Sequence, residues 1–87
     1  MVDPTHRLIG TISDLVVEDD ELRWAVVDLG LLRSSHFVPL DRGRMSEAGE
    51  LVVPYDKRTV RDAPEADRTH RIDEATRQRL RRHYELA

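Results

Sequence analysis

The sequence predicts a mainly β protein: a small, strongly bent antiparallel β-barrel followed by a C-terminal α-helix. Between residues 8 and 62, short runs rich in β-branched residues alternate with acidic, glycine or proline turns. The paired Ala63-Pro64 ends this series, and the last residues change to a helical period. We therefore expect one β domain over residues 1–67, with a polar linker and an amphipathic helix over residues 68–87.

The short length of the chain makes stability a constraint. A domain of 87 residues buries only about 60% of the surface that its unfolded chain exposes. Closing the sheet into a barrel, docking the helix or pairing with a second copy would each bury more apolar surface. A homodimer is therefore an early expectation.

The first strand is expected over residues 7–17, which are rich in β-branched residues. Its apolar residues change parity near Ser13, from Leu8 and Ile12 to Leu15 and Val17. A one-residue bulge there would keep both pairs on one face and would bend the strand, as small barrels require at their corners. Gly10 predicts a tight bend or a close backbone approach in the same strand.

The second strand is expected over residues 22–29, with the acidic run of residues 18–21 as the tip of a hairpin. That run lacks the alternating oxygen ligands and the central glycine of a calcium loop, so we interpret it as a solvated turn. Trp24 lies in the middle of the apolar run and is expected in the core.

A third, shorter strand is expected over residues 36–40. Leu31 and Leu32 precede it, where the chain leaves the second strand. Pro39 cannot donate a ladder hydrogen bond, which predicts an edge or a strand end. Residues 41–44 are expected to form a turn.

A polar link over residues 45–49 and a further strand over residues 50–55 follow. Asp56 is a candidate N-cap for a short helical turn that Pro64 ends from beyond. Residues 65–71 are polar throughout and are expected to form a linker.

The C-terminal helix is the clearest element of the sequence. Asp73 is the expected N-cap, Glu74 suits the positive end of the helix dipole, and three to four turns are expected. At about 100° per residue, one apolar stripe collects Ile72, Thr76, Leu80, His83, Tyr84 and Ala87. This stripe can pack on the chain's own barrel, on a second copy or on another protein, and the sequence leaves these alternatives open.

The composition excludes several kinds of function. Hydrophobic residues make up 39% and charged residues 36% of the chain, and no apolar run approaches the roughly 20 residues that span a bilayer. We expect no membrane insertion, and the first residues carry no signal-peptide pattern, so a cytoplasmic location is expected. The chain has no cysteine, which excludes disulfides and thiolate chemistry.

The sequence carries no motif for catalysis, metal binding or cofactor binding. The four histidines lack metal-ligand spacing, the serines lie in no nucleophile elbow, and the glycines form no phosphate loop. Asp14 and Asp28 can be placed opposite each other across the hairpin as an acid and base pair, the weakest of our hypotheses. We therefore expect a non-enzymatic protein without metal or cofactor.

Charge is unevenly distributed along the chain. Residues 1–56 carry 5 basic and 11 acidic side chains, whereas residues 57–87 carry 9 basic and 6 acidic ones. The acidic part contains the predicted strands, so the C-terminal helix is the one candidate for contact with nucleic-acid phosphates.

Several blocks of the chain occur in a recognisable order: Leu8 to Val17, Leu22 to Gly30, Phe37 to Leu40, Val60, and Ala63-Pro64. Over about residues 7–67 this order resembles a PRC-barrel domain. The resemblance implies a small, bent antiparallel barrel that serves as an assembly or adaptor module. Members of this family include the cytoplasmic part of a photosynthetic reaction-centre subunit and the C-terminal region of a ribosome maturation factor. The resemblance implies no catalytic residues.

The leading functional hypothesis is a freestanding cytoplasmic module that binds protein, and first of all a second copy of itself. We expect contacts through the barrel edges and the helix stripe, at Leu31, Leu32, Phe37, Leu80 and Tyr84. The alternative is an RNA- or ribosome-associated factor whose helix touches phosphates through Arg77, Arg81 and Arg82.

Overall fold

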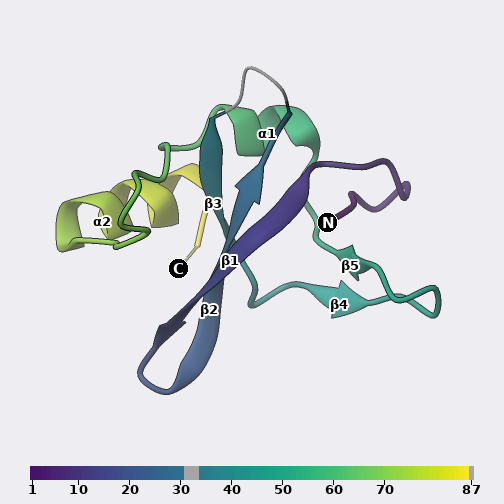
Figure 1. The fold of residues 1–87 in the computed structure, drawn as a ribbon, viewed down its shortest axis with the longest axis horizontal. Helices are drawn as coiled ribbons and strands as arrows, with labels where there is room; N and C mark the ends of the chain where they lie inside the picture. Colours follow the sequence, from purple (N-terminus) through teal and green to yellow (C-terminus); the bar gives the residue numbers. More distant parts are fainter. Residues whose placement is uncertain (31–33, 87) are drawn as a thin grey trace.

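The computed structural model describes residues 1–30 and 34–86 (Figure 1). Its elements, in chain order, are β1 (Thr11–Glu18), β2 (Glu21–Asp28), β3 (Ser35–Pro39), β4 (Arg44–Met45), β5 (Leu51–Val52), α1 (Lys57–Arg61) and α2 (Glu74–His83). The protein is therefore mainly β with a C-terminal helix, as predicted. Within the described ranges, neither helix has the length and apolar character needed to cross a membrane.

Strands β1 and β2 form the predicted antiparallel hairpin with its acidic tip. Asp19 and Asp20 both have positive φ, at 52° and 64°, between the paired residues Glu18 and Glu21. Two-residue turns of this left-handed kind match the right-handed twist of the flanking strands, and aspartate tolerates the conformation better than most residues. The left-handed conformation of this turn thus explains the two aspartates at the tip.

The predicted bulge in the first strand is confirmed. The pairing of β1 with β2 shifts register between Ile12 and Asp14, and shifts again between Val16 and Val17. Gly10 also has the predicted close approach, because a Cβ atom there would lie 2.4 Å from the Asp28 carbonyl oxygen. Any side chain at this position would push β1 away from the end of β2.

Strand β3 completes a sheet of order β1-β2-β3 and ends at Pro39, as predicted from the missing N–H. Strands β4 and β5 form a second, two-stranded sheet. Strand β4 occupies Arg44 and Met45, where we expected the end of a turn and the start of a polar link, so that prediction was wrong. Its residues are exposed and carry no apolar alternation, and the strand exists through its pairing with Leu51 and Val52.

The N-terminal segment connects the two sheets. Val2 bridges Leu8 on one side and Val52 on the other. The Val2 amide donates to the Leu51 carbonyl at 2.9 Å, the Val53 amide donates to the Val2 carbonyl at 3.1 Å, and the Ile9 amide donates to the Met1 carbonyl at 2.9 Å. Among the described residues the strands form these two linked sheets, and no closed barrel is found.

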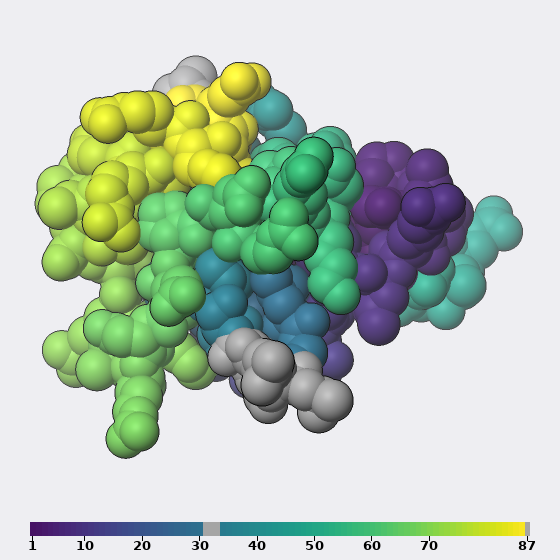
Figure 2. Space-filling model, turned by 90° about the horizontal axis from the view of Figure 1, so that it is seen from above, coloured from purple at the N-terminus to yellow at the C-terminus, as the bar shows by residue number. Residues whose placement is uncertain are grey.

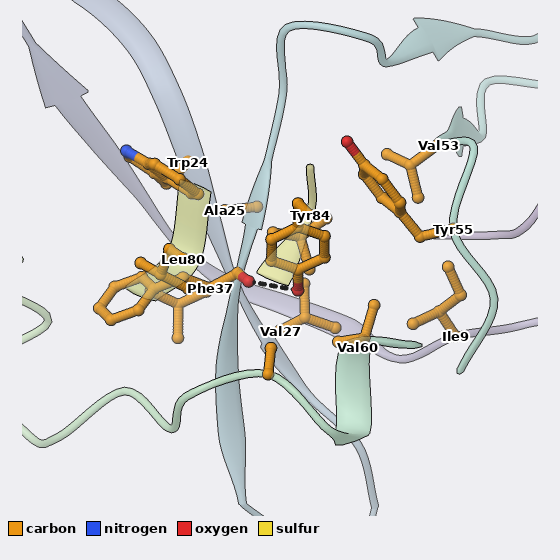
Figure 3. Close-up of a cluster of buried hydrophobic side chains, with 13 residues drawn as sticks. Ile9, Trp24, Ala25, Val27, Phe37, Val53, Tyr55, Val60, Leu80 and Tyr84 are labelled. Atoms are coloured by element: carbon orange, nitrogen blue, oxygen red, sulfur yellow. Dashed lines mark hydrogen bonds between the residues drawn. The ribbon is translucent and has the colours of Figure 1, made fainter. Parts of the chain in front are cut away.

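The core surrounds β2, in which Trp24 to Val27 are all buried. Because successive side chains of a strand point to opposite faces, both faces of β2 are covered at this level. Figure 3 shows Trp24, Phe37 and Leu80 on one side and Ile9, Val53 and Val60 on the other. The prediction that Trp24 lies in the core is confirmed.

Both predicted N-caps are present. The Asp56 carboxylate accepts a hydrogen bond from the Thr59 amide at 2.8 Å, and the Asp73 carboxylate accepts one from the Thr76 amide at 2.7 Å. Helix α2 packs on its own chain, since Leu80 is buried and the Tyr84 hydroxyl donates to the Phe37 carbonyl at 2.7 Å. The end of α2 lies beside α1 (Figure 2), where the His83 ring contacts the Thr59 carbonyl.

Substituting Gly10 tests the close approach of β1 to β2. We expect Gly10→Ala to lower the free energy of unfolding by about 1–3 kcal/mol, because the added methyl group meets backbone atoms that cannot move freely. For a domain of this size, that loss lowers the melting temperature by at least about 4 °C. Thermal unfolding followed by circular dichroism measures it. Thr11→Ala, at the exposed neighbouring position, should change little, and an unchanged melting temperature for Gly10→Ala would contradict the packing described here.

Candidate functional site

An apolar groove of about 710 Å³ lies between the β1–β2 hairpin and the sheet formed by β4, β5 and the N-terminal segment. In Figure 1 the β4–β5 pair lies on the opposite side of the hairpin from helix α2. The groove, which we call the apolar groove, is lined by Met1, Val2, Leu8, Ile12, Leu15, Leu22, Leu40, Met45, Gly49, Glu50 and Leu51.

Four large side chains of the apolar groove are open to solvent. Leu8, Leu15, Leu22 and Met45 are between 46% and 66% exposed. Leu8, Ile12 and Leu15 line the groove together, so the bulge keeps these three residues on one side of the strand as expected. Val17, which was expected on the same face, does not line the groove, because a second register shift separates it from Val16. The side that carries Leu8, Ile12 and Leu15 is an open surface here. Large exposed apolar patches on small proteins commonly mark binding surfaces.

The lining of the apolar groove carries little charge. Of the described residues, Glu50 is the one charged side chain that lines it, and it lies 3.2 Å from the His6 ring. Such a surface presents no large field of a single sign to a partner.

Three of the predicted contact residues do not lie at this surface. Phe37, Leu80 and Tyr84 are at most 3% exposed and belong to the core around β2, so they are unavailable for surface contact in this fold. Leu31 and Leu32 lie outside the described residues. The helix stripe predicted an apolar face correctly, but that face is covered by the chain's own sheet. The sequence feature that could have located this surface is the pair of apolar residues, Leu15 and Leu22, on either side of the acidic tip.

A polar latch holds the tip of the hairpin to α2. One oxygen of Glu18 accepts a hydrogen bond from the Trp24 indole nitrogen at 3.0 Å, and the other accepts one from the Arg77 guanidinium. Arg77 also donates to Glu74 at 2.7 Å. The hydrogen bond from Arg77 holds the pKa of Glu18 below its usual value.

The latch changes the interpretation of the predicted phosphate contacts. Arg77 is held between two carboxylates of its own chain. Arg81 lines a pocket of about 390 Å³ next to this latch, with Trp24 and Arg42. Arg82 is exposed on the same helix. Arg77 and Arg81 therefore line one pocket, together with the carboxylates of Glu18 and Asp41, whereas Arg82 lies outside it.

A serine and a histidine lie together at the start of β3, which the sequence analysis did not identify. The buried His36 ring lies with Nδ1 2.9 Å from the Ala63 carbonyl oxygen and Nε2 2.6 Å from Ser34 Oγ. A carbonyl can only accept, so Nδ1 carries the proton and, in the neutral ring, the Ser34 hydroxyl donates to Nε2. Ser34 and the Ala63 carbonyl thus give both ring nitrogens of the buried His36 a hydrogen-bond partner. Neither Ser34 nor His36 lines the apolar groove.

The carboxylates proposed as an acid and base pair have separate partners. Asp14 binds the His70 ring at 2.8 Å, and Asp28 accepts a hydrogen bond from Ser35. The hydrogen bond from His70 holds the pKa of Asp14 below its usual value. Within residues 1–30 and 34–86, no three histidines, aspartates or glutamates are grouped as metal ligands would be.

Comparison with models of known protein families and with curated proteins gave no match to this chain.

The latch makes stability depend on pH. The pKa of Glu18 is lower in the folded chain than its ordinary 4.5, so its contribution is present above that pH and is lost as the pH falls through the folded-state value. At about pH 7 we expect Glu18→Gln to lower the free energy of unfolding by about 1 kcal/mol. The gap between parent and variant should close toward about pH 3.

Urea denaturation followed by the fluorescence of the single tryptophan, Trp24, measures this dependence. Asp20→Asn, at the exposed tip of the same hairpin, is the control and should change the free energy of unfolding little at any pH. A gap between parent and Glu18→Gln that stays constant with pH would rule out the ion pair as its cause.

Proposed function

We propose that the protein is a non-enzymatic interaction module of the PRC-barrel type that self-associates through the apolar groove. The single observation that carries the proposal is the group of four exposed apolar side chains, Leu8, Leu15, Leu22 and Met45, in one groove of an 87-residue chain. Leaving such side chains in water forgoes roughly 1.5–3 kcal/mol for each one that could be fully buried. A second copy would remove them from water.

The apolar lining favours a second copy over a strongly charged partner. In a two-fold interface the same surface meets itself, so a surface with many charges of one sign would repel its copy. Among the described residues, Glu50 is the one charged side chain that lines the groove, and it lies 3.2 Å from the His6 ring of its own chain. Association would also stabilise a domain that is too small to bury a large core.

The barrel type of the fold is part of the same proposal. The sequence blocks that resemble a PRC-barrel domain include the segments that form β1, β2 and β3. The bridges of Val2 to Leu8 and to Val52 support a bent, barrel-like course, because they link the two sheets edge to edge. The proposed location is the cytoplasm.

The alternative function, an RNA- or ribosome-associated factor, ranks second. It would use exposed arginines of α2 such as Arg79 and Arg82. Arg77, which we expected to contact phosphates, is occupied by Glu18 and Glu74. An exposed basic helix surface attracts any polyanion and by itself specifies none.

Sedimentation equilibrium tests self-association directly. At micromolar concentration we expect a mass above that of the 10.1 kDa monomer. We expect Met45→Glu and Leu8→Glu each to raise the dissociation constant about tenfold or more, because each would place a charge within the apolar contact. Both positions are exposed, so the monomer should stay folded.

Ala75→Glu is the matched control for these variants. Ala75 is exposed on α2 and does not line the apolar groove, so the dissociation constant should stay within about twofold of the parent value. A parent chain that sediments as a monomer would refute the proposal. Equal weakening by Ala75→Glu would place the interface elsewhere.

A further inference from the structure

A second hollow, on the helical side of the molecule, has the features of a site for a small anion. It has a volume of about 490 Å³ and lies between the segment after β5, helix α1 and the end of α2. Tyr55, Arg42 and Arg58 line it, and we call it the Tyr55 pocket. None of these residues lines the apolar groove, so the inference is independent of the proposed self-association.

Tyr55 carries a buried hydroxyl without a hydrogen-bond partner. The residue is 8% exposed, and among the described side chains its oxygen is the one buried polar atom left unpaired. The ring packs at 4.8 Å from that of Tyr84, whose own hydroxyl is satisfied by the Phe37 carbonyl. Figure 3 shows the Tyr55 hydroxyl directed away from Val60 and Ile9. A buried unpaired donor costs about 1–3 kcal/mol, so a partner that accepts its hydrogen bond is strongly favoured.

The positive charges beside this hydroxyl come from two different elements. Arg42 lies in the turn after β3 and Arg58 lies in α1, and both are exposed. Within the described part of the chain, neither guanidinium forms a hydrogen bond or an ion pair. Asp41 and Arg42 are both close enough to Tyr55 to act on it electrostatically, and the Asp41 carboxylate has the larger effect. Burial raises the pKa of Tyr55, so at neutral pH the hydroxyl is protonated and can donate.

The other charged groups around the pocket limit the charge of the ligand. Asp62 and Glu85 also line it, and Arg61 lies 3.8 Å from Asp62. The His83 ring is already bonded to the Thr59 carbonyl at 2.7 Å. With Asp41 near Tyr55, three carboxylates surround two guanidinium groups and would repel a polyphosphate. The site can therefore hold only a single small anionic group, bound against the arginines.

We propose that the Tyr55 pocket binds the carboxylate or phosphate group of a small molecule. Tyr55 donates one hydrogen bond to an anionic oxygen, and Arg42 and Arg58 supply charge and the planar donor geometry that suits carboxylate and phosphate. The shared chemistry of the two groups is an oxygen anion that accepts several hydrogen bonds.

Titrations of the full chain with inorganic phosphate and with acetate test the site, with sodium chloride at matched ionic strength as reference. Amide chemical shifts from NMR report where each anion binds and with what dissociation constant. We expect saturable shifts at residues of the Tyr55 pocket with at least one of the two anions, and the stronger binder identifies the group. Shifts that follow ionic strength equally in chloride would overturn the proposal.

Tyr55→Phe separates binding from folding. Without ligand, its melting temperature should equal or exceed that of the parent, since the variant removes a hydroxyl that has no partner. Its dissociation constant for the anion should rise about tenfold, as should that of Arg42→Gln combined with Arg58→Gln. A marked loss of stability in Tyr55→Phe would show that the hydroxyl is already satisfied, and unchanged binding would show that it does not contact the anion. Either result refutes the site.

A matched double variant controls for net charge. Arg68→Gln combined with Arg71→Gln removes two exposed positive charges from the linker, outside the Tyr55 pocket. Binding to this variant should match the parent. Equal weakening by both double variants would attribute the effect to overall charge and would contradict a defined site.

Discussion

The middle of strand β2 is buried on both faces, and the other elements are arranged so that each of these faces is covered. Four consecutive residues, Trp24 to Val27, lie out of water, and alternate side chains of a strand point to opposite faces. Two separate covers are therefore needed. Helix α2 contributes Leu80 to one side, and the segments around Ile9, Val53 and Val60, with Tyr84 just after α2, contribute the opposite side. The N-terminal segment holds this second cover in place, because Val2 pairs with Val52 of β5 and with Leu8, which precedes β1.

The elements packed on the two faces of β2 extend over only part of the hairpin. Toward the acidic tip, β1 and β2 run beyond the core, and the latch between Glu18 and Arg77 holds one side of that outer half to α2. The other side carries Leu15 and Leu22 and meets only the apolar groove. Among the described residues, no segment covers this side. A partner surface of the same chemistry would cover it, which is the physical basis of the proposed self-association.

Features that depend on residues near one another in the chain could be predicted from the sequence, whereas pairing between distant segments could not. The acidic turn, the β1 bulge, the close approach at Gly10, and the caps Asp56 and Asp73 each depend on residues near one another in the chain. Strand β4 and the bridges of Val2 depend on partners tens of residues away and leave no periodic signal. The contact residues show the same limit. Spacing indicates which residues share a face, as for Leu80 and Tyr84, but only tertiary packing determines whether that face is covered. The unpaired hydroxyl of Tyr55 has no signature in sequence at all.

In the proposed dimer, the open side of the hairpin and the β4–β5 sheet form the contact surface with the second copy. Amide hydrogen exchange measured at increasing protein concentration tests it most directly, because protection that grows with concentration maps the interface. Our account predicts that protection rises in the segments that carry Leu8, Leu15, Leu22 and Met45, and stays constant in α1 and α2. Concentration-dependent protection confined to the helices, or exchange that does not change with concentration anywhere, would contradict it.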